Sequence, residues 1–113
     1  MLKVAIVGCG LVADQHLTQI RRVPDATIVA VCDSEPLMAR QLSDRFKVPG
    51  CFYDVKEMLK SARPHIVHIT TPAKSHYPLG KICLEAGCHV YIEKPFTVTA
   101  VQTEEILSIA EAR

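Results

Sequence analysis

Residues 2–13 read Leu-Lys-Val-Ala-Ile-Val-Gly-Cys-Gly-Leu-Val-Ala, and this stretch decides the fold. Its first six residues are apolar apart from Lys3, and a short apolar run that stops at a glycine predicts a strand buried on both faces. Apolar residues then recur at helical spacing, at Ala13, Leu17, Ile20 and Val23, and Pro24 ends the run. A strand that turns through glycines into a helix is the first half of a strand–helix–strand unit, from which parallel sheets are built.

The rest of the chain repeats this alternation. Four more strands are expected, at residues 27–31, 51–53, 65–70 and 89–92. Helical apolar spacing predicts further helices within residues 34–46, 54–62, 79–86 and 99–113. The order predicts a doubly wound α/β fold of the Rossmann type, a mostly parallel sheet with helices on both faces. Because a complete sheet of this type has six strands, we expect a single domain over residues 1–113 that is truncated before its last strand.

Capping residues mark several helix ends. Ser34, Asp54 and Thr99 are expected to cap three helix starts, since a proline, a glutamate or a glutamine follows each at the appropriate spacing. Gly87 is expected just past a helix end, where the backbone often turns left-handed.

The glycine loop has the form G-x-G-x-x-A and connects a predicted strand to a predicted helix. Gly8 permits the tight turn, Gly10 lets the backbone approach a pyrophosphate, and Ala13 allows close helix–strand packing. The helix start also offers unpaired N–H groups and a partial positive charge to phosphates, which makes Leu11 and Val12 candidate cofactor-binding residues. The alternative is an ordinary turn between a strand and a helix.

Asp33 ends the second predicted strand, twenty residues after Ala13. An acidic residue at this spacing typically binds the ribose hydroxyls of a dinucleotide. A carboxylate there repels a 2′-phosphate, and the next residues are Ser34 and Glu35 rather than an arginine. The pattern therefore predicts NAD in preference to NADP. The alternative for Asp33 is a helix cap after the strand.

The composition excludes several classes of protein. Thirteen basic and twelve acidic residues leave a net charge of +1, too small a surplus for a nucleic-acid-binding surface. No apolar stretch approaches the roughly 20 residues of a membrane span, and the first residues do not resemble a signal peptide. We therefore expect neither a nucleic-acid nor a membrane partner.

The cysteines and histidines suggest no metal. Five cysteines without a Cys-x-x-Cys pair argue against disulfides, a redox motif and a zinc site. Free thiols fit a reducing compartment, so we expect a cytoplasmic protein. Four histidines lack ligand-type spacing to carboxylates or cysteines and are interpreted as packing or surface residues: His16, His65, His68 and His89.

The second half of the chain carries three further motifs. They are Thr-Pro-Ala-Lys-Ser-His at residues 71–76, Glu-Ala-Gly-Cys-His-Val at residues 85–90 and Glu-Lys-Pro at residues 93–95. With the glycine loop and Asp33, these motifs resemble the Gfo/Idh/MocA oxidoreductases, the family of glucose–fructose oxidoreductase and inositol dehydrogenase. The resemblance covers essentially the whole chain.

This resemblance implies roles for several residues. Thr71 and Pro72 would line the cofactor beside its pyrophosphate and nicotinamide half, and Glu93 would approach the nicotinamide ribose. Lys94 would be the catalytic lysine that binds and polarises the substrate hydroxyl or carbonyl. His76 has the family position and is a candidate cofactor-binding residue, but bracing of the following helix is an equal alternative.

Three positions in the second half of the chain bear on this resemblance and on the site. Family members often carry a cis bond before the proline at Pro95, which the sequence does not reveal. Many members have asparagine where this chain has Ala73, which leaves the local loop contact open. The position of Lys94 after a buried strand independently favours a ligand-binding role, because open α/β sheets bind ligands at that edge. The alternative is a lysine that simply reaches into solvent.

The resemblance also implies what the chain does. In this family the substrate pocket lies in a second domain, so we expect an NAD-binding module of an oxidoreductase that acts on a sugar or cyclitol-type substrate. A dinucleotide-sensing regulatory domain without turnover is the main alternative, and a methyltransferase is disfavoured by the glycine loop and the Glu-Lys-Pro motif. A bare edge at the fifth strand predicts self-association, and hence a homo-oligomer.

Overall fold

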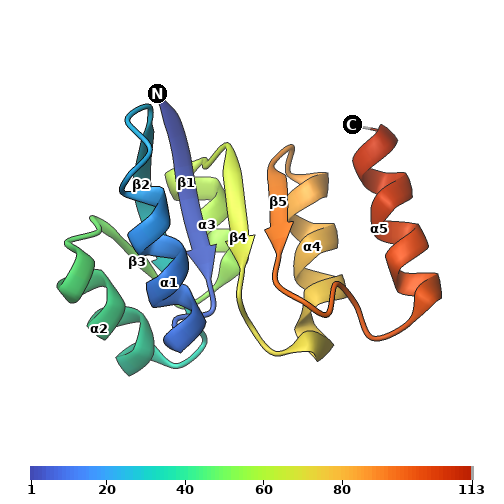
Figure 1. Cartoon of the computed structure of the whole chain (residues 1–113), viewed down its shortest axis with the longest axis horizontal. Helices are drawn as coiled ribbons and strands as arrows, with labels where there is room; N and C mark the ends of the chain where they lie inside the picture. The colour runs from blue at the N-terminus through green and yellow to red at the C-terminus, as the bar shows by residue number, and fades with distance from the viewer. Residues whose placement is uncertain (113) are drawn as a thin grey trace.

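Helices and strands alternate along the whole of the computed structural model, which describes residues 1–112 (Figure 1). The strands are β1 (Leu2–Val7), β2 (Ala26–Cys32), β3 (Gly50–Phe52), β4 (Ile66–Ile69) and β5 (His89–Ile92). The helices are α1 (Leu11–Ile20), α2 (Pro36–Phe46), α3 (Val55–Ala62), α4 (His76–Glu85) and α5 (Ala100–Ala112). A short 3₁₀ turn, η1 (Ala73–Ser75), precedes α4.

The five strands form one parallel sheet in the order β3-β2-β1-β4-β5. The chain winds outward from β1 to β3, crosses back, and winds outward again from β4 to β5. This doubly wound, Rossmann-type α/β fold confirms the prediction from the sequence. The winding reverses between β1 and β4, where sheets of this kind open a crevice for ligands.

Two apolar layers hold the helices on the sheet. On one face α1 and α2 pack through Ile6, Leu17 and Leu42. On the other face α3 and α4 cover Ile69 and its neighbours on β1, β2 and β4. The last helix, α5, packs against α4 at the end of the molecule (Figure 1). Within residues 1–112, β5 is therefore an edge strand of the sheet.

Two expected helix ends differ from the structure. The first helix ends at Ile20, and Val23 lies in the following turn with 48% of its surface exposed. The sequence predicted a longer helix because Val23 is apolar and continues the helical spacing, although the residue is not buried. Ser34 does not cap α2, whose capping position is Glu35. No side chain caps α2, and the neighbouring Asp33 instead accepts a hydrogen bond from the Glu35 N–H with its Oδ1, at 2.8 Å.

The other predicted caps are confirmed. The Asp54 carboxylate accepts a hydrogen bond from the Glu57 N–H at 3.1 Å, and the Thr99 hydroxyl accepts one from the Gln102 N–H at 3.1 Å. Gly87 follows the end of α4 with a left-handed φ of +90°. None of the helices in the described part of the chain is long and apolar enough to cross a membrane.

Candidate functional site

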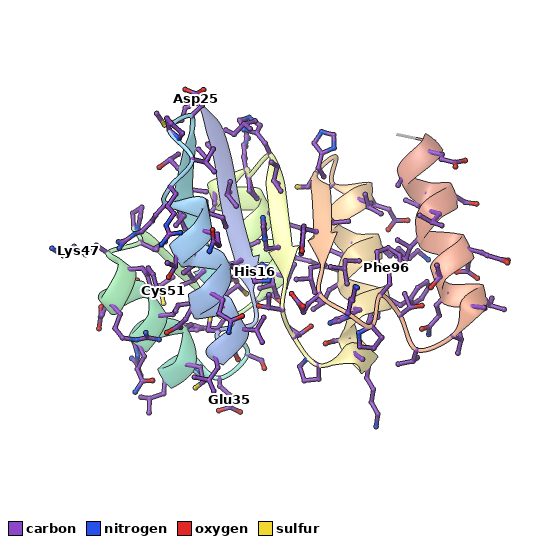
Figure 2. The ribbon with its side chains drawn as sticks, in the orientation of Figure 1. His16, Asp25, Glu35, Lys47, Cys51 and Phe96 are labelled. Atoms are coloured by element: carbon purple, nitrogen blue, oxygen red, sulfur yellow. The ribbon has the colours of Figure 1, made fainter. Side chains whose placement is uncertain are left out.

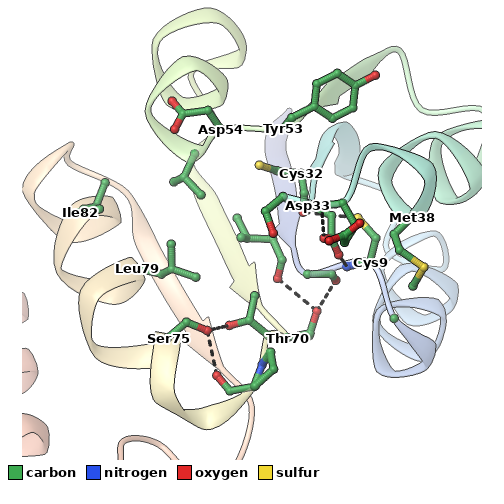
Figure 3. A pocket seen from close by; sticks show the side chains of 18 of the residues that line it. Cys9, Cys32, Asp33, Met38, Tyr53, Asp54, Thr70, Ser75, Leu79 and Ile82 are labelled. Carbon is green, nitrogen blue, oxygen red and sulfur yellow. Dashed lines mark hydrogen bonds between the residues drawn. The ribbon is translucent and has the colours of Figure 1, made fainter.

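A cleft of about 960 Å³ opens at the carboxyl ends of β1, β2 and β4 (Figure 3). One wall consists of the glycine loop after β1 and the residues that end β2. The opposite wall consists of the turn after β4 and the first part of α4. Five of the residues selected from the sequence line it together: Gly8, Gly10, Asp33, Thr71 and Pro72.

Gly8 closes the bottom of the cleft and must be glycine. Its φ is +97°, and a Cβ there would lie 2.7 Å from the Thr71 nitrogen. Such an approach is closer than van der Waals contact allows, so any side chain would force β1 and the turn after β4 apart. The Thr70 hydroxyl fixes the same contact by donating a hydrogen bond to the Gly8 carbonyl at 2.7 Å.

Gly10 has a different reason to be glycine. It is the capping residue of α1, with a φ of −83° that any residue can adopt. A Cβ at Gly10 would meet no protein atom within 4 Å. The space above this residue is open to the cleft, so the missing side chain leaves room for a ligand to approach the backbone.

The start of α1 supplies hydrogen-bond donors. No side chain caps it, and within residues 1–112 the N–H groups of Leu11 and Val12 have no acceptor. Both side chains are exposed, Leu11 to 87%, and neither lines the cleft. Unpaired N–H groups and the positive end of the helix dipole suit a phosphate.

Asp33 is fixed in place by the backbone on both sides. Its Oδ2 accepts a hydrogen bond from the Cys9 N–H at 2.9 Å, and its Oδ1 accepts one from the Glu35 N–H at 2.8 Å. Each carboxylate oxygen keeps a second lone pair for a ligand. Asp33 therefore holds the residue before α2 without capping the helix, and it presents an oriented carboxylate to the cleft (Figure 3).

The charges around Asp33 are mostly negative. Glu35 and Asp54 line the same cleft, and Lys56 is the one basic side chain among its lining residues within the described chain. Two lining cysteines are neutral, because burial, with a smaller effect of nearby carboxylates, raises the pKa of Cys9 and of Cys32 to about 12. This end of the cleft thus favours hydroxyl groups over a phosphate.

Ser75 stabilises the opposite wall of the cleft through its hydroxyl group. Its hydroxyl donates to the Thr71 hydroxyl at 2.7 Å and lies 2.8 Å from the Pro72 carbonyl, which holds the turn after β4 in shape. Leu79 and Ile82 continue this wall as an apolar surface along α4 (Figure 3). Both residues lie in the helix that was predicted within residues 79–86, but helical spacing alone does not indicate that they line a cleft.

Sequence reasoning missed other lining residues. Tyr53 and Met38 lie at the rim of the cleft, 45% and 37% exposed. Tyr53 directly follows β3, so the rule that ligands bind at carboxyl ends of strands provides the signal that would have found it. Met38 lies on α2 outside its buried residues, which are Ala39 and Leu42.

The segment after β5 lies outside the cleft lining. Glu93 and Lys94 follow the strand at the same edge of the sheet, with Lys94 exposed and the Lys94–Pro95 bond cis. His76 is 1% exposed, and its Nε2 lies 2.7 Å from the Thr71 carbonyl oxygen. Its Nδ1 lies 2.7 Å from the Pro95 carbonyl oxygen. His76 thus braces the turn after β4 against the segment that carries Lys94, and a direct contact with cofactor stays a prediction.

Two histidines differ from their interpretation as packing or surface residues. The His16 Nε2 lies 2.7 Å from the Glu93 Oε2, and its Nδ1 lies 2.8 Å from the His68 Nδ1. The missed partner is a carboxylate 77 residues along the chain, which only the sheet topology brings close. His65 accepts a hydrogen bond from the Lys3 N–H at 2.9 Å and His89 is exposed, so these two are peripheral. No cluster within residues 1–112 is suited to a metal ion.

The comparison with known families decides the classification. A family model described as an oxidoreductase family with an NAD-binding Rossmann fold, Gfo/Idh/MocA, matches residues 2–113. The chain belongs to this family. The Gfo/Idh/MocA relationship confirms the resemblance seen in the glycine loop and the Glu-Lys-Pro motif.

Individual relatives agree with this assignment. The chain is 37% identical over 110 residues to D-glucoside 3-dehydrogenase of Escherichia coli, covering 96% of the chain and 31% of that protein. It is 29% identical over 112 residues to the NADP-dependent scyllo-inositol 2-dehydrogenase of Bacillus subtilis, covering 99% and 34%. A solved WlbA dehydrogenase of Chromobacterium violaceum, in complex with NADH and UDP-GlcNAcA, is 30% identical with a TM-score of 0.91, covering 98% and 32%. The chain spans about a third of the length of these proteins.

Proposed function

We propose that this chain is the cofactor-binding domain, residues 1–113, of an NAD-dependent oxidoreductase. The enzyme would transfer hydride between the nicotinamide and a hydroxyl or carbonyl of a sugar or cyclitol-type substrate. The single observation that carries the proposal is the oriented Asp33 carboxylate in a cleft that the open Gly10 backbone also lines. The substrate would be bound mainly by a second domain.

The residues of the cleft fit a dinucleotide. Asp33 would accept hydrogen bonds from the adenosine ribose hydroxyls, and the backbone at Gly10, Leu11 and Val12 would hold the pyrophosphate. Thr71 and Pro72, on the opposite wall, would border the nicotinamide half. When bound, the nicotinamide accepts or donates a hydride, which is the chemistry that no side chain supplies.

Lys94 is our candidate for the catalytic residue. It is exposed at the carboxyl edge of the sheet, directly after β5, where it has room to reach a substrate. An ammonium group that donates a hydrogen bond to the substrate oxygen stabilises negative charge as it develops there during hydride transfer. The preceding Glu93 would accept a hydrogen bond from the nicotinamide ribose, and His76 would hold the segment in place.

We expect NAD to bind more tightly than NADP. The carboxylates of Asp33, Glu35 and Asp54 all border the expected ribose site, while Lys56 alone opposes them. The 2′-phosphate of NADP is negatively charged and would be repelled by these carboxylates. It also replaces the ribose hydroxyl that Asp33 would bind. The relative from Bacillus subtilis is named for NADP, so the preference is a property to be measured on this chain.

We also propose a cytoplasmic homo-oligomer. The five cysteines are all unpaired in the described chain, and four of them are buried, which fits a reducing compartment. The edge strand β5 has a free side, which fits pairing with another copy.

Calorimetric titration of NAD and NADP into the wild-type chain and Gly10→Ala tests the proposal. The added methyl group meets no protein atom, so the variant should fold like the wild type while blocking the approach of a pyrophosphate. We expect binding of NAD to the wild type, weaker binding of NADP, and at least tenfold weaker NAD binding to Gly10→Ala, about 1.4 kcal/mol. A folded wild-type chain that binds neither nucleotide would overturn the proposed function.

A further inference from the structure

We propose that His16 is a positioning residue, which holds the Glu93 carboxylate at the carboxyl edge of the sheet, and that His68 fixes the His16 ring for this task. The inference rests on the proposed function, in which Glu93 faces the nicotinamide ribose and Lys94 the substrate. It adds a residue from α1 to a part of the site that otherwise belongs to the segment after β5.

The geometry joins two distant segments of the chain. His16 lies on α1 and points toward β4 (Figure 2), and its Nε2 is 2.7 Å from the Glu93 Oε2. The side chain of His16 is 11% exposed and that of Glu93 is 37% exposed. The contact is thus partly shielded on the histidine side and open on the carboxylate side, where a ligand would bind.

Hydrogen-bond chemistry fixes the direction of this contact. The hydrogen bond from His16 lowers the pKa of Glu93, so the group is an ionised carboxylate that only accepts. The His16 Nε2 must therefore carry the proton and donate it. The other ring nitrogen, Nδ1, faces the His68 Nδ1 at 2.8 Å, where one nitrogen donates and the other accepts.

Aromatic packing orients both rings. His68 stacks on Tyr91 with a centroid distance of 5.0 Å and an interplanar angle of 11°. His16 meets both of these rings edge-on, at 5.1 Å from His68 and 5.3 Å from Tyr91. Because the ring of His16 is held on two sides, its Nε2 has little freedom to point anywhere except at Glu93.

The charged neighbours leave this contact intact. Burial, together with the nearby His16, lowers the pKa of His68 to about 4, so His68 is neutral at neutral pH. Asp14, on the same helix as His16, is paired with Arg45 at 2.6 Å. On the side of α4, His76 contributes weakly to the lowered pKa of Glu93. Tyr91, from β5, is the remaining titratable group that faces His16.

The contact with His16 restricts the Glu93 side chain, because the Glu93 backbone is itself held by the sheet. The Glu93 N–H donates to the Ile69 carbonyl at 3.0 Å, so the main chain of Glu93 is already tied to the sheet. The remaining freedom is the direction of the Glu93 side chain, which His16 removes. A carboxylate that is oriented before the ligand arrives loses less conformational freedom on binding.

Carboxyl-carbon NMR titration of the 113-residue chain without cofactor tests the contact directly. In the wild type, we expect Glu93 to titrate below the ordinary value of a glutamate, and the His16 Nε2 to donate its proton to the Glu93 carboxylate. In His16→Leu the Glu93 midpoint should rise toward that ordinary value. In His16→Gln, whose amide can still donate from a similar position, it should stay close to the wild-type value.

Gln15→Leu is the matched control, since Gln15 is an exposed neighbour on the same helix. This variant should leave the Glu93 titration unchanged. An unchanged Glu93 midpoint in a folded His16→Leu variant would overturn the positioning role. If His16→Leu does not fold, the wild-type spectrum decides, because a Glu93 midpoint at the ordinary value of a glutamate contradicts the proposal without any variant.

Calorimetry with NAD separates this inference from the proposed function. We expect His16→Leu to weaken NAD binding by about three- to tenfold, the usual effect of losing one oriented hydrogen bond, and His16→Gln to restore most of it. A His16→Leu chain with wild-type NAD affinity would overturn the role in ligand binding. A wild-type chain that binds no NAD would overturn the proposed function instead, while the titration of Glu93 would still decide whether His16 positions it.

Discussion

Asp33 illustrates how one side chain serves the fold and the site together. Its two oxygens accept backbone hydrogen bonds from Cys9 and Glu35, which tie the glycine loop to the start of α2. The same bonds prevent the carboxylate from rotating, so the two lone pairs that remain face the cleft. A substitution at this position therefore removes a brace and a ligand contact at once.

Asp33→Ala should narrow the difference between NAD and NADP affinity. The loss of a hydrogen bond between a carboxylate and a ribose hydroxyl costs about 1.5–3 kcal/mol in NAD binding, while NADP loses a repulsive neighbour. Calorimetry with both nucleotides measures the effect, and Asp44→Ala, an exposed carboxylate on α2, is the control. An unchanged affinity ratio in Asp33→Ala contradicts the assignment of this residue.

Lys94→Ala should separate turnover from cofactor binding. In the enzyme that carries this chain, we expect kcat to fall by roughly 10²-fold or more, the usual scale for a positioned acid–base group. The dissociation constant for NAD should change by less than about threefold, since the proposed anchors of the cofactor are Gly10 and Asp33. Lys60→Ala, an exposed lysine on α3, should leave both quantities unchanged. Lost NAD binding with retained turnover at saturating NAD would make Lys94 a cofactor anchor instead.

His68 should make the chain less stable in mild acid. An unfolded histidine titrates near pH 6.5, whereas burial lowers the pKa of folded His68 to about 4. Between these values the unfolded state binds more protons, so stability is complete above about pH 6.5 and falls by up to about 3 kcal/mol as the pH approaches 4. Urea unfolding across this range should show a shallower pH dependence for His68→Phe than for the wild type. The exposed His89→Gln should follow the wild type, and equal slopes for all three chains would rule out this role of His68.

Much of the site follows from local sequence, and the rest depends on topology. The glycine loop and Asp33 were found because their chemistry is concentrated at the ends of two neighbouring strands. The contact between His16 and Glu93 was not found, because it forms only when β4 and β5 are added beside β1. Val23 shows a limit of local sequence in the other direction, because helical spacing predicted a helix that continues to this residue. An apolar residue can continue the spacing of a helix and still lie outside the helix.

At the scale of whole elements, two helices end on residues with strained backbones. Lys47 follows α2 with a φ of +54°, and Arg63 follows α3 with a φ of +46°. Neither helix end has a glycine at this position, in contrast to Gly87 after α4. The left-handed conformation costs a residue with a Cβ about 1–2 kcal/mol, which is tolerated here because each helix must turn toward the next strand.

Lys47→Gly should therefore stabilise the chain. Relief of the left-handed strain outweighs the greater flexibility of glycine in the unfolded state, and we expect a gain of about 0.5–1 kcal/mol. Arg40→Gly, at an exposed position inside α2, should instead cost about 1 kcal/mol. Urea denaturation of both variants measures the free energies of unfolding, and destabilisation of similar size in both would show that the strain at Lys47 is negligible.

For the whole molecule, the most consequential feature is the free side of β5. Within residues 1–112 the strand pairs only with β4, and Tyr91 is 54% exposed. A free parallel edge offers unpaired N–H and C=O groups to another chain. The domain therefore has its ligand cleft at one edge of the sheet and a surface suited to association along another.

We expect the isolated chain to self-associate at high concentration through this edge. Light scattering should show a molar mass that rises with concentration, and Tyr91→Lys should reduce the rise, because charged residues on an edge discourage strand pairing. Leu107→Lys, which replaces a 51% exposed apolar residue on α5, is the matched control. A monomer at all concentrations, or a loss of association only in the control, would exclude association through β5.

The contact of Gly8 with Thr71 also has a genetic consequence. Every amino acid that a single-base change can substitute for glycine carries a Cβ, and at Gly8 this atom would lie 2.7 Å from the Thr71 nitrogen. Missense alleles at this codon should therefore behave like loss of the protein. Alleles at the codon for Gly10 should instead produce a folded chain that binds its nucleotide only weakly, because a Cβ there meets no protein atom.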